Sequence, residues 1–69
     1  MKMPEIELTG NRLASVNGCR GILEYTDTAV RINTQSMILC FNGNNLRIKF
    51  LSENTIEIAG VISKLEFVY

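Results

Sequence analysis

The sequence predicts an all-β fold: a small antiparallel meander of about seven to eight short strands, folded into a two-layer roll or partly open barrel. Three observations predict it. Apolar and polar residues alternate with the two-residue period of strands, β-branched residues are plentiful, and turn sequences recur about every ten residues. No stretch shows the long i, i+3, i+4 spacing of an amphipathic helix. A β-solenoid-like stack is the alternative, because the strand–turn units recur so regularly.

The strands are expected at residues 5–9, 13–16, 19–25, 30–34, 37–41, 46–50, 56–59 and 61–69. The first alternates cleanly, with Ile6 and Leu8 facing inward. Pro4 precedes it, at a position where a strand tolerates a missing N–H donor. Asn17-Gly18, between the second and third strands, is the strongest two-residue turn signal in the chain.

The hairpin over residues 19–34 organises the meander, because most other strands pair onto it in register. A four-residue loop at 26–29 is favoured, since Asp and Thr suit a type I turn. This loop creates three cross-strand pairs: Tyr25 with Val30, Leu23 with Ile32, and Glu24 with Arg31. A two-residue loop would lose both the charge pair and the Tyr25 contact.

The later strands are expected to pair in sequence through loops at 35–36, 42–45 and 51–55. These loops give the pairs Thr34–Met37, Ile32–Leu39, Val30–Phe41, Phe41–Leu46, Leu39–Ile48, Met37–Phe50, Phe50–Ile56, Ile48–Ile58 and Lys49–Glu57. One face is then apolar. The reverse face carries charges together with Ile22, Ile38 and Cys40, and such an apolar patch with a polar rim often marks an interface.

Two features do not fit a flat, one-sided sheet. Residues 37–41 are apolar on both faces, as in a strand that is covered on both sides. After Ala59-Gly60 the inward positions change from even to odd, with Val61, Leu65, Phe67 and Tyr69 expected inward. A glycine at such a change indicates a bulge or corner. We therefore expect the last segment to fold back and, with the first strands, to cover the meander.

The composition bounds the class of protein. Residues 1–69 make one domain, and seven basic residues balance seven acidic ones, which gives no general attraction for nucleic acid or an anionic membrane. No apolar run reaches the ~20 residues of a membrane helix, and residues 1–4 are too short for a targeting peptide. Cys19 and Cys40 without a signal peptide fit free thiols in a reducing compartment. A cytoplasmic location is expected.

The residue types in this sequence give little support for a catalytic function. Without histidine there is no imidazole base, no ordinary catalytic triad and no histidine-bearing zinc site. Glu5 and Glu7 are interpreted as a solvated strand face, and residues 17–21 match neither phosphate-binding glycine motif. No enzymatic activity, cofactor, metal or small-molecule substrate is expected. The alternative is a small nucleic-acid-binding β-barrel, but Glu24 and Glu57 neutralise its basic face and aromatic residues are few.

The most specific motif is Arg20-Gly21-Ile22-Leu23-Glu24-Tyr25, followed by Arg31-Ile32-Asn33-Thr34. With further matches at 3–11, 17–19, 45–49 and 56–67, the chain resembles the YabP/YqfC family of sporulation proteins over nearly its whole length, and specifically the YqfC branch. Two features depart from the family pattern. Ser36 and Asn42 stand near positions that usually hold glycine, and the chain begins almost at the domain, without the longer charged leader of many relatives.

The resemblance implies a small protein of endospore-forming bacteria, made in the mother cell and required for sporulation. It implies no enzymatic activity or cofactor, and its usual companion is a polytopic membrane protein of the YqfD type. We therefore expect a non-catalytic assembly module that forms homo-oligomers or docks on that companion, in the cytoplasm or peripherally at a membrane. Charges near a hairpin end influence partner choice. The candidate partner surface is Asn17, Arg20, Glu24, Asp27 and Arg31.

Overall fold

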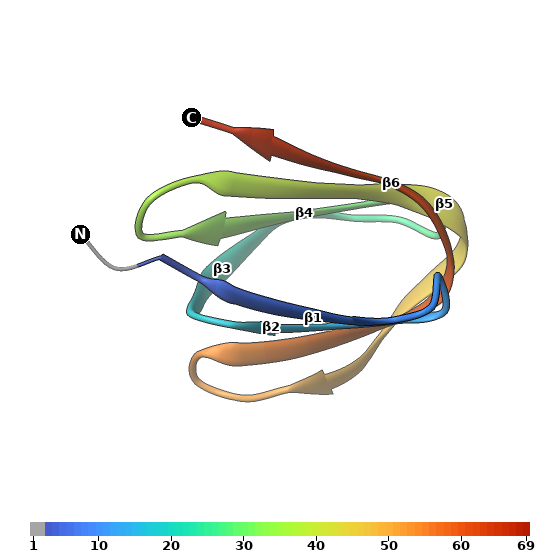
Figure 1. Ribbon diagram of the computed structural model, residues 1–69, viewed down its shortest axis with the longest axis horizontal. Helices are drawn as coiled ribbons and strands as arrows, with labels where there is room; N and C mark the ends of the chain where they lie inside the picture. The colour runs from blue at the N-terminus through green and yellow to red at the C-terminus, as the bar shows by residue number, and fades with distance from the viewer. Residues whose placement is uncertain (1–2) are drawn as a thin grey trace.

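A computed structural model describes residues 3–69 as one antiparallel sheet of six strands, with no helix among these residues (Figure 1). The strands are β1 (Glu5–Thr9), β2 (Leu13–Asn17), β3 (Cys19–Tyr25), β4 (Ala29–Thr34), β5 (Ile38–Leu51) and β6 (Thr55–Val68). Their order across the sheet is β1-β2-β6-β5-β4-β3. The sheet does not close into a barrel, and the predicted all-β meander roll is confirmed. Met1 and Lys2 lie outside the described residues. They are part of the segment 1–4, for which no targeting role is expected.

The roll is built by β5 and β6, which are 14 residues long each and pair with one another along most of their length. Both strands bend in the middle. β4 pairs only with the first half of β5, and β2 pairs only with the first half of β6. One layer therefore holds β3, β4, the first half of β5 and the second half of β6. The other layer holds β1, β2 and the remaining halves (Figure 1).

Two glycines permit the bend. A Cβ atom on Gly43 would lie 1.8 Å from the carbonyl oxygen of Val61, and one on Gly60 would lie 2.5 Å from the carbonyl oxygen of Asn45. Gly60 also has φ +134°, in the region that favours glycine. The corner predicted at Ala59-Gly60 is therefore confirmed.

The expected loop at 42–45 is wrong, because the chain bends there and continues as one strand. Asn-Gly-Asn-Asn is a typical loop sequence, but the glycine in the facing strand lets both strands turn the corner together. The strands expected at 37–41 and 46–50 are thus one strand, β5, and those expected at 56–59 and 61–69 are β6. This merging reduces the expected seven to eight strands to six.

The predicted register is correct around the short turns. The observed pairs include Tyr25–Val30, Glu24–Arg31, Val30–Phe41, Ile32–Leu39 and Ile48–Ile58. Thr34 N donates a 3.0 Å hydrogen bond to Met37 O, which closes the β4–β5 turn as expected. The Thr34 hydroxyl reinforces this turn, since it donates to Met37 O at 2.6 Å and accepts from Met37 N at 3.1 Å.

The predicted pairs that do not form lie at bulges and at the bend. A register shift sets Ile22, and not Leu23, opposite Ile32, so Ile22 belongs to the inner face and not to the reverse face. A second shift sets Phe50 opposite Glu57, which removes the expected Phe50–Ile56 and Lys49–Glu57 pairs. Because β5 is continuous, the expected Phe41–Leu46, Leu39–Ile48 and Met37–Phe50 pairs do not form. The partners of Phe41 and Leu39 in β6 are Leu65 and Phe67.

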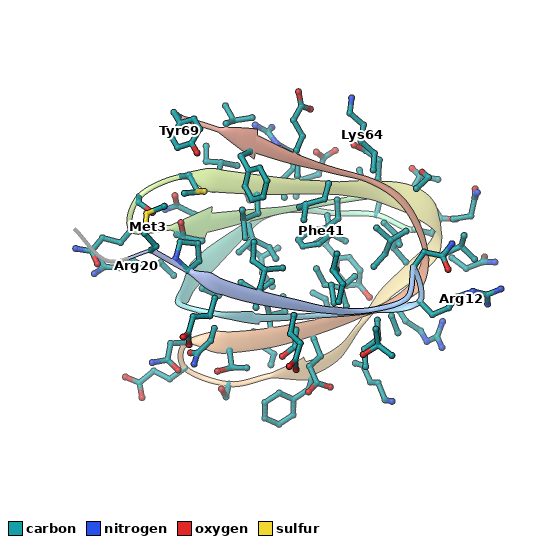
Figure 2. The ribbon with its side chains drawn as sticks, viewed as in Figure 1. Met3, Arg12, Arg20, Phe41, Lys64 and Tyr69 are labelled. Atoms are coloured by element: carbon teal, nitrogen blue, oxygen red, sulfur yellow. The ribbon has the colours of Figure 1, made fainter. Side chains whose placement is uncertain are left out.

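The hydrophobic core lies between the two layers, with Phe41 in the interior (Figure 2). The largest fully buried side chains are Phe41, Ile32, Leu39, Ile56, Ile58, Val16 and Val30. Six residues expected on the inner face are exposed instead: Leu8 is 50% exposed, Leu23 53%, Tyr25 50%, Phe50 49%, Phe67 48% and Tyr69 90%. The reason is position. β1 and the second half of β5 are the outermost strands of one layer, and β3 and the second half of β6 are those of the other.

Candidate interaction surface

Asn17 and Arg20, two of the predicted partner-surface residues, line the same shallow hollow of about 190 Å³. It lies at the end of the roll that holds the first described residues, and Figure 2 shows Arg20 there beside Met3. The Asn17 Oδ1 atom accepts a 3.4 Å hydrogen bond from the Thr55 hydroxyl. The structure thus brings Asn17 and Arg20 together at one hollow.

The other three predicted residues lie elsewhere. Glu24 and Arg31 are exposed cross-strand neighbours on the outer face of β3 and β4. Asp27 lies in the β3–β4 turn, and at ~3.3 Å per residue it is roughly 20 Å along the hairpin from Arg20. The five residues therefore do not form one patch, because β3 carries them to opposite ends of the roll.

Unpaired strand edges are the feature that sequence reasoning did not locate. β1 and β3 stand at the two ends of the sheet, so each has one edge without a partner strand among residues 3–69. The second halves of β5 and β6 also lack a partner on one side in this part of the chain, because β4 and β2 end at the bend. Unpaired N–H and C=O groups along such edges are templates for pairing with another chain.

The edges of β3 and the second half of β5 are tied to one another. Ile48 N donates a 3.0 Å hydrogen bond to the Tyr25 hydroxyl, and Leu46 N donates a 2.8 Å bond to Asp27 O. At the other end of β3, Cys19 N donates a 3.0 Å bond to Asn54 O. These contacts bridge the two layers on this side and occupy the Leu46 and Ile48 amides on the β5 edge.

Tyr25→Phe is expected to loosen this bridge. The hydroxyl is the acceptor for Ile48 N, and the loss of one such bond at a partly exposed site costs about 0.5–1.5 kcal/mol. Chemical denaturation should show a lower midpoint with an unchanged slope, and the Ile48 amide should exchange its proton faster. Tyr69→Phe, at a 90% exposed position, serves as the control. Unchanged exchange at Ile48 would contradict the role of the Tyr25 hydroxyl.

The opposite side of the roll is open and apolar. A groove of about 300 Å³ lies there, lined by Met3, Pro4, Ile6, Met37, Phe67 and Tyr69. Figure 2 shows Met3 and Tyr69 at the same end of the molecule. The groove separates β1 from the second half of β6, so two unpaired edges and exposed apolar side chains occur together on this side.

The reactive groups of the described residues are dispersed. Cys19 is a buried free thiol and Cys40 a half-buried one. Within residues 3–69, no three His, Cys, Asp or Glu side chains gather as a metal-binding group. The same residues form no helix that is long and apolar enough to span a membrane.

In a comparison with protein families, the model of the YabP family matches residues 2–69, which is nearly the whole chain. The chain belongs to the YabP family. Membership in this family fits a sporulation-related role in general. A search of curated proteins found no match.

In this YabP-family chain, the second half of β6 is the surface that sequence reasoning missed. Its sequence carried a partial signal, since charged Lys64 and Glu66 alternate with apolar Leu65 and Phe67. Such alternation indicates a strand with one apolar face. It does not indicate that the strand lies at an edge, because that depends on where β2 ends in the folded sheet.

Proposed function

We propose that this chain is a non-catalytic assembly module of the YqfC branch, acting in endospore formation. It works in the mother-cell cytoplasm by self-association or by docking on a polytopic membrane protein of the YqfD type, and docking would bring it to the membrane periphery. The observation that carries the proposal is the open side of the roll, where two unpaired strand edges flank an apolar groove.

The open side supports an assembly role for a physical reason. Single-chain sheet proteins usually blunt their edges, because an exposed edge next to apolar side chains promotes association. Here Phe67 and Leu8 are about half exposed beside the β6 and β1 edges. A partner chain that pairs with either edge would cover these side chains and satisfy the backbone groups at the same time.

The nucleic-acid-binding alternative has weaker support. Arg31 lies in one layer, whereas Arg47 and Lys49 belong to the second half of β5 in the other layer. This separation does not give one continuous basic stripe, and the net charge of zero adds no general attraction for phosphate. Phosphate recognition depends on such a stripe, and its binding weakens steeply with salt.

Copurification from sporulating cells tests the proposed function. A tagged copy of this chain, expressed in an endospore-forming bacterium that encodes it, should retain a YqfD-type membrane protein from the detergent-solubilised membrane fraction. Deletion of the gene should reduce the yield of heat-resistant spores. The control is a tagged Leu39→Asp variant, whose core is disrupted. Retention of nucleic acid that is lost with added salt, together with a normal spore yield, would overturn the proposal.

A further inference from the structure

We infer that two copies of this chain pair through the second half of β6, antiparallel and centred on Leu65, so that Lys64 of each copy faces Glu66 of the other. The inference rests on the proposed function and names the surface of its self-association. The interface is a closed two-fold contact in which the same edge serves both copies.

The direction of the backbone groups supports this surface. Thr34 N donates to Met37 O, so Met37 and every second residue after it in β5 turn their N–H and C=O toward β4. The intervening residues turn toward β6, where Cys40 faces Glu66. Leu65, next to Glu66 and without a register shift between them, therefore turns its N–H and C=O toward the open edge.

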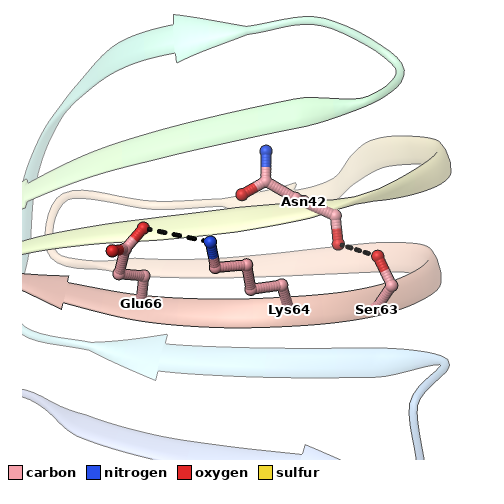
Figure 3. Close-up of polar contacts among 4 residues, drawn as sticks. All are labelled: Asn42, Ser63, Lys64 and Glu66. Atoms are coloured by element: carbon pink, nitrogen blue, oxygen red, sulfur yellow. Dashed lines mark hydrogen bonds and ion pairs between the residues drawn. The ribbon is translucent and has the colours of Figure 1, made fainter.

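The charges on this edge are self-complementary. Lys64 and Glu66 lie on the outer face, with side chains 62% and 54% exposed and 3.6 Å between Nζ and Oε1 (Figure 3). In an antiparallel pair centred on Leu65, the two Leu65 residues are opposite one another. Each Lys64 is then opposite the Glu66 of the other copy, which gives two pairs of opposite charge. A pair centred on Glu66 would set two carboxylates face to face.

A lysine on an edge strand usually discourages pairing. In this register, however, Glu66 of the other copy lies opposite Lys64 and neutralises its charge across the interface. On the outer face, the charges then alternate along one row from this chain into its copy: Glu24, Arg31, Cys40 and Glu66, followed by Lys64 of the second copy. The row has no neighbouring like charges.

The other edges fit self-pairing less well. Antiparallel pairing of β1 centred on Ile6 would set Glu5 opposite Glu7, which is a repulsive contact on both sides of the centre. β3 is irregular, with two register shifts, and such bulges hinder a continuous ladder. The second half of β5 is already contacted by Tyr25 and Asp27.

The fold also sets the length of the paired segment. Gly60 N and Ile62 N donate to Arg12 O at 3.1 Å and to Asn11 O at 2.7 Å, so the β1–β2 turn covers the edge before residue 63. The free edge runs over residues 63–68. On its inner face, Leu65 packs against the core and Phe67 is half exposed at the groove. The second copy would cover both side chains from the open side.

Charge reversal tests the pairing directly. Sedimentation velocity over a range of concentrations should show a dimer for the wild-type chain and a roughly tenfold or larger rise in the dimer dissociation constant for Lys64→Glu and for Glu66→Lys, because two favourable pairs become two like-charge pairs. An equimolar mixture of the two variants should form a one-to-one heterodimer, since the edge with two carboxylates then faces the edge with two ammonium groups. The double variant should dimerise as the wild type does.

A second readout needs no variant. Amide exchange at Leu65 and Phe67 should slow as the wild-type concentration rises, whereas exchange at Leu8 on the β1 edge should not change. A wild-type chain that stays monomeric at every concentration, or single variants that dimerise as tightly as the wild type, would overturn the edge pairing. That result would leave docking on the membrane companion to its own copurification test, so the two failures are distinguishable.

Discussion

Gly43→Ala is expected to unfold the roll. The new Cβ atom would lie 1.8 Å from Val61 O, 2.9 Å from Val61 C and 3.1 Å from the Cα of Ile62. All three are backbone atoms, so no change of rotamer relieves the contact, and β5 and β6 must separate where they turn the corner. The total stability of a chain of this size is about 3–10 kcal/mol at 0.05–0.15 kcal/mol per residue. Opening the bend between the two longest strands is expected to remove most of it.

Circular dichroism and urea denaturation would measure this effect, with Gly21→Ala as the matched control. Gly21 also lies in a strand, but a Cβ there meets nothing within 4 Å. Its substitution is expected to change the free energy of unfolding by no more than about 0.5–1 kcal/mol. If Gly43→Ala unfolded cooperatively at the wild-type midpoint, the continuous bent β5 would be wrong and a loop at 42–45 would explain the chain better.

Leu39→Asp is expected to leave the chain unfolded in water. Leu39 is fully buried between the layers and pairs with Ile32 on one side and Phe67 on the other. Loss of a buried leucine side chain costs about 2–5 kcal/mol, and burial of an unpaired carboxylate adds several kcal/mol more. The sum reaches or exceeds the total stability expected for a domain of this length. Loss of strand signal and of a cooperative unfolding transition is the expected observation.

Leu8→Asp is the control for this substitution, since it makes the same chemical change at a 50% exposed position in β1. It should fold, and its free energy of unfolding should fall far less. The pair also separates the sequence expectation, in which both leucines face inward, from the structure, in which only Leu39 is buried. Equal loss of stability in the two variants would mean that β1 is covered after all.

The surface charges have a different role from the core in these tests. Lys64 and Glu66 are solvated, and their ion pair within one chain contributes little to folding, because exposed pairs are worth about 0–1 kcal/mol. Charge reversal at either position should therefore leave the midpoint of unfolding nearly unchanged at low protein concentration. Changes in assembly can then be measured without a change in fold.

Local patterns determined a large part of the fold. The β3–β4 and β4–β5 hairpins follow from short turns, because a short loop fixes which residues face one another. Val30, Ile32, Leu39 and Phe41 could be placed in the core from this register, and all four are fully buried. The change in alternation at Ala59-Gly60 also predicted the corner, because a side chain pattern cannot shift by one position in a regular strand.

The tertiary structure alone decided the bend of β5, the exposure of the edges and the separation of the candidate surface residues. Asn42-Gly43-Asn44-Asn45 has the composition of a hairpin loop, and it stays in a strand because Gly43 lies against Val61 and Gly60 against Asn45. These contacts join residues far apart in the sequence, so no local pattern encodes them. Leu8 and Phe67 alternate like core residues, but their exposure depends on which strand lies beside them. The sequence by itself thus determined the pairs that short loops hold in register, whereas long-range backbone packing decided where the sheet turns and which edges remain open.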